Sequence, residues 1–273
     1  GRMGVSTLQK GQDCPTCGLK DMNCPGHFGH IKFHLPVFHI GYIKELLRIF
    51  KVICKSCGHV LLEPAQRKHL LAMYSRAYKM NKRAREKVWS IVQKQAGKAR
   101  PCPTCGVPNG VVKKYKTELK FYHEKKHKIF DDMKLEFRKE FEEAEKHNDD
   151  LADCLKHARD DIDALKAYQL LSQVPDADCK LLNLDPKISR PEDLVVRGML
   201  IPPVCLRPTS KSGSGTTEDD LTAKLMSIIV SNNTIKENIT KGDGLETLKA
   251  NWGQLQKLCA EYVNADTPGL LKD

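Results

Sequence analysis

Eight residues of the types that bind zinc occur in this chain of 273 residues at the spacing of metal ligands, in two sets of four. The first set is compact, and its members are Cys14, Cys17, Cys24 and His27. The second set is split along the chain, and its members are Cys54, Cys57, Cys102 and Cys105. Four thiolate or imidazole ligands complete a tetrahedral structural zinc site and leave no position for water or substrate. The sequence therefore predicts two closed zinc sites that stabilise the fold.

Glycine follows each of the three Cys-x-x-Cys pairs, at Gly18, Gly58 and Gly106. Two thiolates so close in sequence bind one ion only if the chain turns sharply after the second, and glycine adopts the positive φ of such a turn at no steric cost. The alternatives are reduced buried cysteines that pair by chance, or a disulfide framework. Both fit less well, because four ligand pairs share one short spacing and disulfide frameworks are typical of much shorter secreted domains.

The other four of the eleven cysteines have no partner at ligand spacing, and they are Cys154, Cys179, Cys205 and Cys259. We expect them to be small buried hydrophobic residues. So many cysteines without a targeting segment indicate a reducing compartment, the cytosol or the nucleus. No apolar stretch approaches the length that crosses a bilayer. No phosphate-binding loop, nucleophile elbow or His-Glu-x-x-His pair is present, so we expect no catalytic residue in this segment.

The net charge of +11 is concentrated in one stretch of the chain. Residues 66–100 hold eleven lysines and arginines against a single glutamate. A basic stretch of this kind favours a polyanionic partner, most often nucleic acid. The densest part contains Lys79, Lys82, Arg83 and Arg85, which we expect to contact phosphates without sequence preference. The alternative is an outer face that meets acidic subunits or water.

Hydrophobic periodicity predicts several helices in the first part of the chain. One covers 41–50, and two more lie within 66–98, broken near Asn81 and ending at Gly97. We expect loops and short extended segments over 1–40. Short strands are predicted for the run Val60-Leu61-Leu62 and after the turn that begins at Asn109.

The second part of the chain also reads as mainly helical. Two helices are predicted within 115–170, and their apolar faces hold Ile129, Met133, Phe137, Phe141, Leu151, Leu155, Ile162 and Leu165. A proline-rich irregular connection over 186–208 and a flexible loop over 211–215 follow. Thr217 and Asp220 suggest a capping box for a helix with Leu221, Leu225, Ile228 and Ile229 on one face. The last predicted helix covers 245–263, with Leu248, Trp252, Leu255, Cys259 and Tyr262 facing inward.

Three motifs near the beginning of the chain resemble a known family. They are Arg2-Met3-Gly4-Val5, the signature Cys-x-x-Cys-x6-Cys-Pro-Gly-His-Phe-Gly-His at 14–30, and Leu35-Pro36-Val37-Phe38-His39. Together they resemble the N-terminal clamp region of the largest subunits of multisubunit DNA-dependent RNA polymerases. The runs 109–114, 202–208 and 214–222 are similar to the RNA polymerase III branch of that family, and the resemblance covers almost the whole chain.

The resemblance implies an α+β fold and assigns the same two ligand sets to zinc. The implied architecture is a zinc-stapled polymerase clamp, with a clamp core and a clamp head, built mostly of helices with short strands around two structural zinc sites. It divides the chain into a zinc knuckle with the entry to the clamp core (1–53), a clamp head with the split zinc site and a helical insertion (54–200), and a helical return to the clamp core (201–273).

The implied function is that of a non-catalytic clamp segment of the largest subunit of RNA polymerase III. Such a segment closes over the cleft and retains template DNA and the RNA–DNA hybrid while small non-coding RNAs are transcribed. The resemblance implies other polymerase subunits, including the second-largest, and transcription factors as partners, no membrane, and a nuclear location. The parent nucleotidyltransferase is expected to bind Mg²⁺ at an Asn-Ala-Asp-Phe-Asp-Gly-Asp motif outside this segment, which is therefore expected to be a piece of a longer chain.

Other functions remain open from the sequence. Within the same family, the alternative is the clamp of RNA polymerase I or II. A free-standing zinc module that binds nucleic acid would present its recognition residues on a helix docked by the zinc. A protein-interaction module of the ring type requires interleaved ligand pairs within a short span, whereas one set here is contiguous over 14–27.

Overall fold

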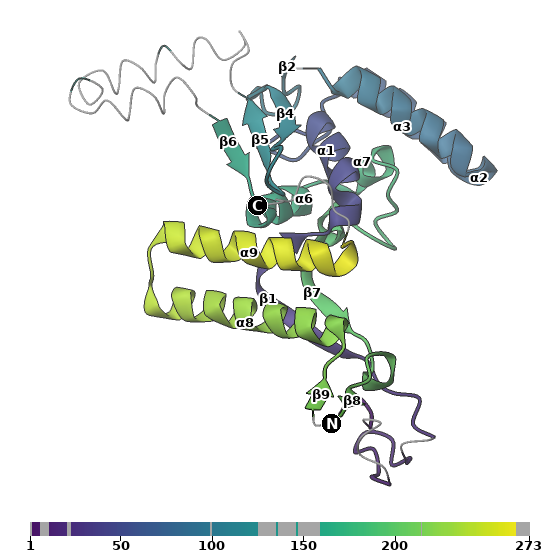
Figure 1. Ribbon diagram of the computed structural model, residues 1–273. Helices are drawn as coiled ribbons and strands as arrows, with labels where there is room; N and C mark the ends of the chain where they lie inside the picture. Colours follow the sequence, from purple (N-terminus) through teal and green to yellow (C-terminus); the bar gives the residue numbers. More distant parts are fainter. Residues whose placement is uncertain are drawn as a thin grey trace. The chain divides into compact units, whose positions relative to one another are not determined.

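The computed structural model describes residues 2–5, 11–20, 23–98, 100–124, 135, 146, 159–213 and 215–265 (Figure 1). The chain forms two compact units. The terminal unit joins Gly1–Ile40 to Val196–Asp273, and the central unit is Gly41–Val195. The predicted mixture of helices and strands is confirmed, while the three-segment division stays a prediction. Within the described ranges, no helix combines the length and apolar character needed to cross a membrane.

The terminal unit combines two small sheets with two long helices that lie side by side (Figure 1). Its elements in chain order are β1 (Gly29–Phe38), β7 (Val195–Ile201), the 3-10 helix η4 (Val204–Leu206), β8 (Ser210–Ser212), β9 (Gly215–Thr217), α8 (Asp220–Lys241) and α9 (Leu245–Val263). β1 pairs with β7, and β8 pairs with β9.

The predicted last helix is confirmed, because α9 covers 245–263. Its inward face packs into one hydrophobic cluster with β1 and α8, and consists of Leu248, Trp252, Leu255, Cys259 and Tyr262. On α8 the prediction holds only in part. Leu225 and Ile228 are buried in this cluster, whereas Leu221 and Ile229 are 40% and 37% exposed. The buried stripe of α8 continues instead through Asn232 and Ile235.

The start of α8 differs from the prediction. Asp219 is the N-cap, and its side chain accepts a hydrogen bond of 2.9 Å from the backbone N–H of Leu221. The predicted capping box of Thr217 and Asp220 is therefore wrong, because Thr217 is the last residue of β9. The predicted flexible loop over 211–215 is also wrong, since it lies within the β8–β9 hairpin, in which Lys211 pairs with Thr216.

β1 is a strand of ten residues, in a part of the chain where only loops and short extended segments are predicted. Its buried residues Ile31 and Phe33 alternate with exposed Lys32 and His34. This is the period of two that is typical of a half-buried strand, and it is visible in the sequence. The prediction for 186–208 is wrong in the same way, because that stretch contains β7.

Side chains of α8 and α9 form hydrogen bonds with backbone N–H and C=O groups of β1. Asn232 accepts from the N–H of His34 and donates to the carbonyl of Lys32, each at 3.0 Å. Gln256 accepts from the N–H of Phe38 at 2.6 Å and donates to its carbonyl at 2.8 Å. Trp252 Nε1 donates to the carbonyl of position 36 at 2.7 Å.

All the backbone groups used in this way belong to even-numbered residues of β1. Successive residues of a strand direct their backbone groups to opposite edges. A Cβ built at Gly198 of β7 would lie 2.7 Å from the carbonyl oxygen of Ile31, so an odd-numbered residue faces the neighbouring strand. The even edge of β1 therefore receives side-chain amides and an indole where a further strand would otherwise pair.

The central unit packs helices around the split cysteine set and a three-stranded sheet. Its elements are α1 (Ile43–Val52) after the 3-10 helix η1 (Ile40–Tyr42), α2 (Pro64–Met80), α3 (Lys82–Ala96), β2 (Arg100–Pro101), β3 (Pro108–Asn109), β4 (Val111–Lys114), β5 (Phe121–Glu124), β6 (Arg159–Ile162), α6 (Ala164–Ser172), α7 (Asp176–Leu181) and η3 (Pro191–Leu194). β2 pairs with β3, and the order β4-β5-β6 forms the larger sheet. Phe50 of α1 meets Phe121 of β5 edge to face, with ring centroids 5.2 Å apart.

The helices predicted for the first part of this unit are confirmed. α1 contains the apolar face expected for 41–50. α2 and α3 are separated at Asn81, whose side chain accepts a hydrogen bond of 2.9 Å from the N–H of Ala84 and so caps α3. α3 ends at Gly97 as predicted. The turn at Asn109 does lead into β4, but the strand predicted for 60–62 is reduced to a single bridge between Val60 and Ile53.

The helices predicted within 115–170 are confirmed only at Leu165, which lies in α6, and the prediction is wrong for Ile162, which lies in a strand. The segments at 121–124 and 159–162 pair as antiparallel strands, so Ile162 is buried in β6 opposite Phe121. α6 begins only after β6, where Asp163 caps it by accepting from the N–H of Lys166 at 2.8 Å. The pairing partner of β6 lies far away in the sequence, so helical spacing alone is misleading here. The remaining predicted residues Ile129, Met133, Phe137, Phe141, Leu151 and Leu155 lie outside the described residues.

A fully buried carboxylate on α7 joins three segments of the central unit. Asp178 accepts the N–H of Val60 at 3.1 Å and forms an ion pair of 2.8 Å with Arg67 Nε of α2. Burial raises the pKa of Asp178, and the Val60 hydrogen bond and the Arg67 charge oppose that rise. Removing one partner of such a pair typically costs about 3–5 kcal/mol, because the other charge is left buried. This pair fixes the N-terminal half of α2.

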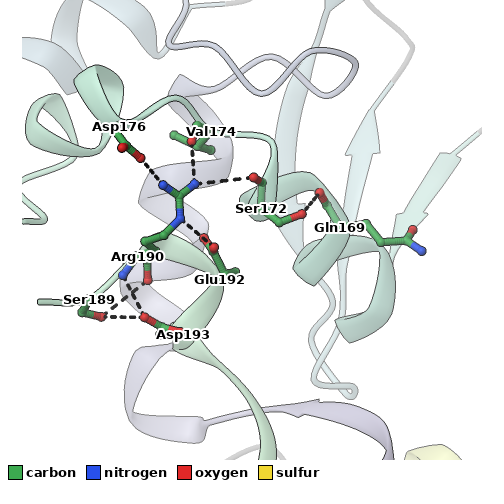
Figure 2. A network of polar contacts seen from close by, with 8 residues as sticks. All are labelled: Gln169, Ser172, Val174, Asp176, Ser189, Arg190, Glu192 and Asp193. Carbon is green, nitrogen blue, oxygen red and sulfur yellow. Dashed lines mark hydrogen bonds and ion pairs between the residues drawn. The ribbon is translucent and has the colours of Figure 1, made fainter. Parts of the chain in front are cut away.

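Arg190 makes a second polar network, at the C-terminal end of α6 (Figure 2). Its guanidinium donates to the backbone carbonyls of Ser172 at 3.5 Å and Val174 at 2.9 Å, and pairs with Asp176 and, at 2.7 Å, with Glu192. The planar guanidinium suits several acceptors at once, which a lysine ammonium does not. A cation is also favourable beside the free carbonyls at a helix C-terminus. Arg190 thus connects α6, α7 and η3.

We predict that Asn232→Ala loosens β1. The substitution leaves the backbone N–H of His34 and the carbonyl of Lys32 without their amide partner, at a cost of about 1–3 kcal/mol for buried polar groups. Native-state hydrogen exchange should show faster exchange at His34, and chemical denaturation should show the loss of stability. Asn233→Ala is the matched control, because Asn233 is exposed on the same helix. Equal effects of the two substitutions would contradict the proposed edge contact.

Candidate metal centres and basic surface

The three Cys-x-x-Cys segments adopt the same backbone turn. In each, the glycine N–H donates to the carbonyl of the first cysteine, at 2.7 Å for Gly18, 3.1 Å for Gly58 and 2.8 Å for Gly106. All three glycines have the predicted positive φ, between 70° and 75°. The first cysteine of each pair also donates its N–H to the carbonyl of the residue after the glycine, which closes the knuckle. Residues with a side chain would be strained at these glycines.

The first predicted ligand set comes together in the terminal unit. The Sγ atoms of Cys17 and Cys24 are 3.7 Å apart, and Cys24 Sγ is 3.6 Å from Nε2 of His27. With Cys14, all four ligand atoms lie within 4.8 Å of one another. Gly26, with φ +80°, lets the chain turn between Cys24 and His27.

The second predicted set comes together in the central unit, although its two pairs are far apart in sequence. Cys54 Sγ is 3.6 Å from Cys105 Sγ, and Cys57 Sγ is 3.7 Å from Cys102 Sγ. These contacts cross 51 and 45 positions of the chain. All four sulfur atoms lie within 4.8 Å of one another. One knuckle precedes α2, and the other follows α3.

Both clusters fit a tetrahedral zinc ion. Two thiolates at a Zn–S distance of about 2.3 Å in a tetrahedron are about 3.8 Å apart, and a thiolate and an imidazole nitrogen are about 3.6 Å apart. The observed separations of 3.6–3.7 Å agree with these edges. A disulfide, by contrast, has sulfur atoms about 2.05 Å apart. The donor sets are thus compatible with two metal ions, each with four protein ligands.

The thiols within a cluster differ in pKa, so they do not all ionise in the same pH range. Backbone hydrogen bonding, first from Thr16 and then from Cys17, lowers the pKa of Cys14 to about 6. Burial raises the pKa of Cys54, but hydrogen bonds from Cys57, Ser56 and Asn109 outweigh it and lower the pKa to about 7. Burial raises the pKa of Cys57 well above its usual range. A divalent cation would remove this conflict, since it holds several thiolates at once.

Backbone N–H groups donate hydrogen bonds to two sulfur atoms of the second cluster. The N–H groups of Ser56 and Thr104 lie 3.4 Å from Cys54 Sγ and Cys102 Sγ. Such donors to thiolate ligands orient them and balance their charge. Lys55 adds a cation beside Cys54 and Cys102; burial lowers its pKa to about 8, and the two thiolates oppose that change.

Asn109 joins the two halves of the split cluster. Its Oδ1 accepts the N–H of Lys55 at 2.9 Å, and its Nδ2 donates to Cys54 Sγ at 3.4 Å and to the carbonyl of Val107 at 2.8 Å. The residue is 1% exposed. Sequence reasoning identifies Asn109 only as a turn residue. The available signal is its position shortly after Cys105, in a segment whose conformation the metal ligands already restrict.

The four other cysteines have different environments. Cys179 and Cys259 are buried, as predicted. Cys205 is exposed, so the prediction for it is wrong; it lies beside the first knuckle, with Sγ 3.6 Å from the carbonyl of Pro25. Pro203, two residues before it, packs against Gly26 of this knuckle. Cys154 lies outside the described residues.

The predicted phosphate-binding residues lie where α2 meets α3. Lys79, Lys82 and Arg83 are exposed. Arg85 is half-buried and therefore less accessible than these three, because its guanidinium lies over the ring of Tyr78, 5.3 Å from the centroid. The structure therefore separates three accessible cations from one that also has a packing role.

More exposed cations continue along α3, and the sequence analysis does not single them out. Lys87 and Lys94 follow Arg83 by four and eleven positions, which places all three on one face of α3. Lys98 continues this spacing beyond the end of the helix. The first turn of α3 has no acidic residue and begins with Lys82 and Arg83. Cations at a helix N-terminus are disfavoured by the helix dipole by about 0.3–1 kcal/mol each.

Comparison with known proteins places these features in a wider group. The family described as "RNA polymerase Rpb1, domain 1" matches residues 2–272. The chain is 38% identical over 268 residues to "DNA-directed RNA polymerase III subunit rpc1" of Dictyostelium discoideum, covering 97% of this chain and 18% of that protein. It is 35% identical over 277 residues to "DNA-directed RNA polymerase III subunit RPC1" of Homo sapiens, covering 98% and 19%.

A more distant relative is "DNA-directed RNA polymerase subunit Rpo1N" of Methanocaldococcus jannaschii. It is 32% identical over 275 residues, which cover 98% of this chain and 18% of the relative. The chain spans less than a fifth of the length of each of these three relatives.

We predict that Asn109→Ala weakens metal binding at the second cluster. The substitution removes one hydrogen bond to Cys54 and the link to Lys55, and loss of such partners typically lowers metal affinity by about 10- to 100-fold. Competition with a chromogenic chelator should release one zinc per chain early. The first cluster serves as the internal control, because its zinc should leave at the unsubstituted rate. Unchanged release of both ions would contradict this role of Asn109.

Proposed function

Because the chain belongs to the family of RNA polymerase Rpb1, domain 1, we propose that it is a clamp segment of the largest subunit of an RNA polymerase III. The segment closes over the cleft and retains template DNA and the RNA–DNA hybrid. The observation that carries this proposal is the pairing of a closed cysteine cluster with a basic helical arm. The cluster joins the beginning and end of the arm α2–α3, and the arm carries most of the excess positive charge. The names of the RPC1 relatives support the assignment to polymerase III.

Two structural zinc ions hold this segment. One would be bound by the first ligand set, through Cys14, Cys17, Cys24 and His27, and the other by the second set of four cysteines. With four protein ligands each, neither ion has a position for substrate, so zinc contributes stability and no chemistry here. The segment itself contributes no catalytic residue. The nucleotidyl-transfer activity and the Mg²⁺ site belong to the rest of the parent enzyme.

The basic arm contributes affinity for nucleic acid without reading its sequence. Lys79, Lys82 and Arg83 are exposed and close together in the chain, which suits contacts with successive phosphates. The face that holds Arg83, Lys87 and Lys94 extends this surface along α3. Binding by ammonium and guanidinium groups gains mainly from the release of counterions, so it is strong at low salt and independent of base identity.

The remaining partners follow from the parent assembly. The segment would contact other polymerase subunits, including the second-largest, and the transcription factors that act with them. Its place of action would be the nucleus. These assignments rest on the relatives, which are named as subunits of a DNA-directed RNA polymerase.

We predict that the two metal sites support different parts of the chain. Cys17→Ser should remove one zinc and loosen mainly the first knuckle. Cys102→Ser should remove the other zinc and release the arm, because the second cluster joins its two ends. Mass spectrometry under native conditions should count two zinc ions in the unsubstituted chain and one in each variant. Hydrogen exchange should show lost protection over 66–98 in Cys102→Ser alone; equal loss in both variants would contradict the ligand pairing.

We predict that the combined substitution of Lys79, Lys82 and Arg83 by alanine flattens the salt dependence of binding to nonspecific duplex DNA. Each lost phosphate contact reduces the slope of log K against log salt by about 0.9. The matched control replaces three exposed lysines of the terminal unit, Lys32, Lys211 and Lys236. Arg85→Ala alone should have a smaller effect, because Arg85 lies over Tyr78. An unchanged slope, with impaired assembly into the polymerase, would instead place acidic subunits on this surface.

A further inference from the structure

A hollow of about 300 Å³ opens in the central unit between the second cysteine cluster and the first turns of α2. Val60 and Leu62, which follow the first knuckle of the cluster, are buried and contribute apolar lining. Leu71 of α2 and Pro103 of the second knuckle add further apolar surface. A hollow of this size is at the lower limit of the range that accommodates a ligand or a single anchoring side chain.

Positive charge borders this apolar hollow. Arg67 and Lys68 both contribute to its lining, and no carboxylate lines it among the described residues. Arg67 is held in place by its ion pair with Asp178 at 2.8 Å, which fixes the guanidinium beside the hollow. Lys68 is exposed. Because Asp178 compensates the charge of Arg67, the exposed ammonium of Lys68 is the cation that makes this apolar recess complementary to an apolar side chain with an acidic neighbour.

We propose that this hollow is a docking site for a protein segment that inserts one aliphatic side chain, such as leucine, and pairs a flanking carboxylate with Lys68. A protein segment fits better than nucleic acid, because the described lining is largely aliphatic and holds no aromatic ring on which a base would stack. The hollow is also remote from the predicted phosphate-binding residues, which lie where α2 meets α3. The 17 residues of α2 separate Pro64, at the hollow, from Met80 by about 25 Å along the helix.

Docking at this hollow depends on the second metal cluster. Val60 lies three residues after Cys57, and Pro103 and Thr104 lie between Cys102 and Cys105. Opposite parts of the lining are therefore set by ligands of the same ion. Loss of that ion would separate them and abolish the recess, whereas loss of the first zinc would leave it intact. The docking site is independent of the proposed role of α3 in nucleic-acid binding.

The test uses the zinc-loaded full chain and a fluorescent acidic peptide with one leucine between runs of aspartate and glutamate. Fluorescence anisotropy should show saturable binding with a Kd below about 1 mM. Replacing the peptide's leucine by serine should weaken binding at least about tenfold, because the aliphatic anchor is lost. Lys68→Glu should weaken binding of the original peptide by a similar factor. Lys236→Glu is the matched control, since it makes the same charge change at an exposed position of α8 in the terminal unit.

Leu71→Glu gives a second variant, because it places a carboxylate in the apolar lining and should also weaken peptide binding. Zinc content and helical circular dichroism establish that each variant is folded. Absence of saturable binding, equal binding of the serine peptide, or equal weakening by Lys236→Glu would each overturn the proposal. A duplex DNA probe provides the remaining comparison. If Lys68→Glu lowers the affinity for DNA and leaves peptide binding unchanged, nucleic acid occupies the hollow and the proposal is wrong.

Discussion

Closure of the second cysteine cluster is the interaction on which the central unit depends. It brings Cys57 next to Cys102 across 45 positions of the chain, and so places the end of α3 beside the beginning of α2. Closing a loop of this length costs conformational entropy, roughly 3 kcal/mol from the length term alone. A structural metal supplies a large free energy at one point. Asn109 and Asp178 then fix the segments on either side, the first through Cys54 and Lys55 and the second through Val60 and Arg67.

This arrangement allows α2 and α3 to carry a charge pattern that would otherwise be costly. α3 begins with Lys82 and Arg83, against the preference of its dipole, and no acidic residue stands in its first turn. The stability of the arm comes instead from its buried face, where Leu70, Val88 and Val92 pack, and from its anchored ends. The outer face is therefore available for positive charge, because the buried face and the anchored ends stabilise the arm.

The sequence predicted best those features that depend on local chemistry. The glycine turns after each Cys-x-x-Cys pair, the break at Asn81, the bounds of α9 and the grouping of eight cysteine and histidine side chains into two clusters all follow from ligand spacing, turn conformation or helical periodicity. Some errors arise where a distant partner decides the structure. Ile162 has an apolar spacing that suits a helix, yet it lies in β6 because β5 pairs with it. Asp178 and Arg67 gave no local sign of their ion pair, since 111 positions separate them in the chain.

The amide side chains of α8 and α9 that bond to β1 affect how readily this strand can pair with another chain. A strand with a free edge recruits other strands, and this is a common route to aggregation. In β1, Asn232 and Gln256 occupy hydrogen-bonding positions that an incoming strand would need, and they are held there by helices whose own packing is apolar. Another copy of the chain therefore cannot pair with this edge of β1 unless these side-chain hydrogen bonds are first broken.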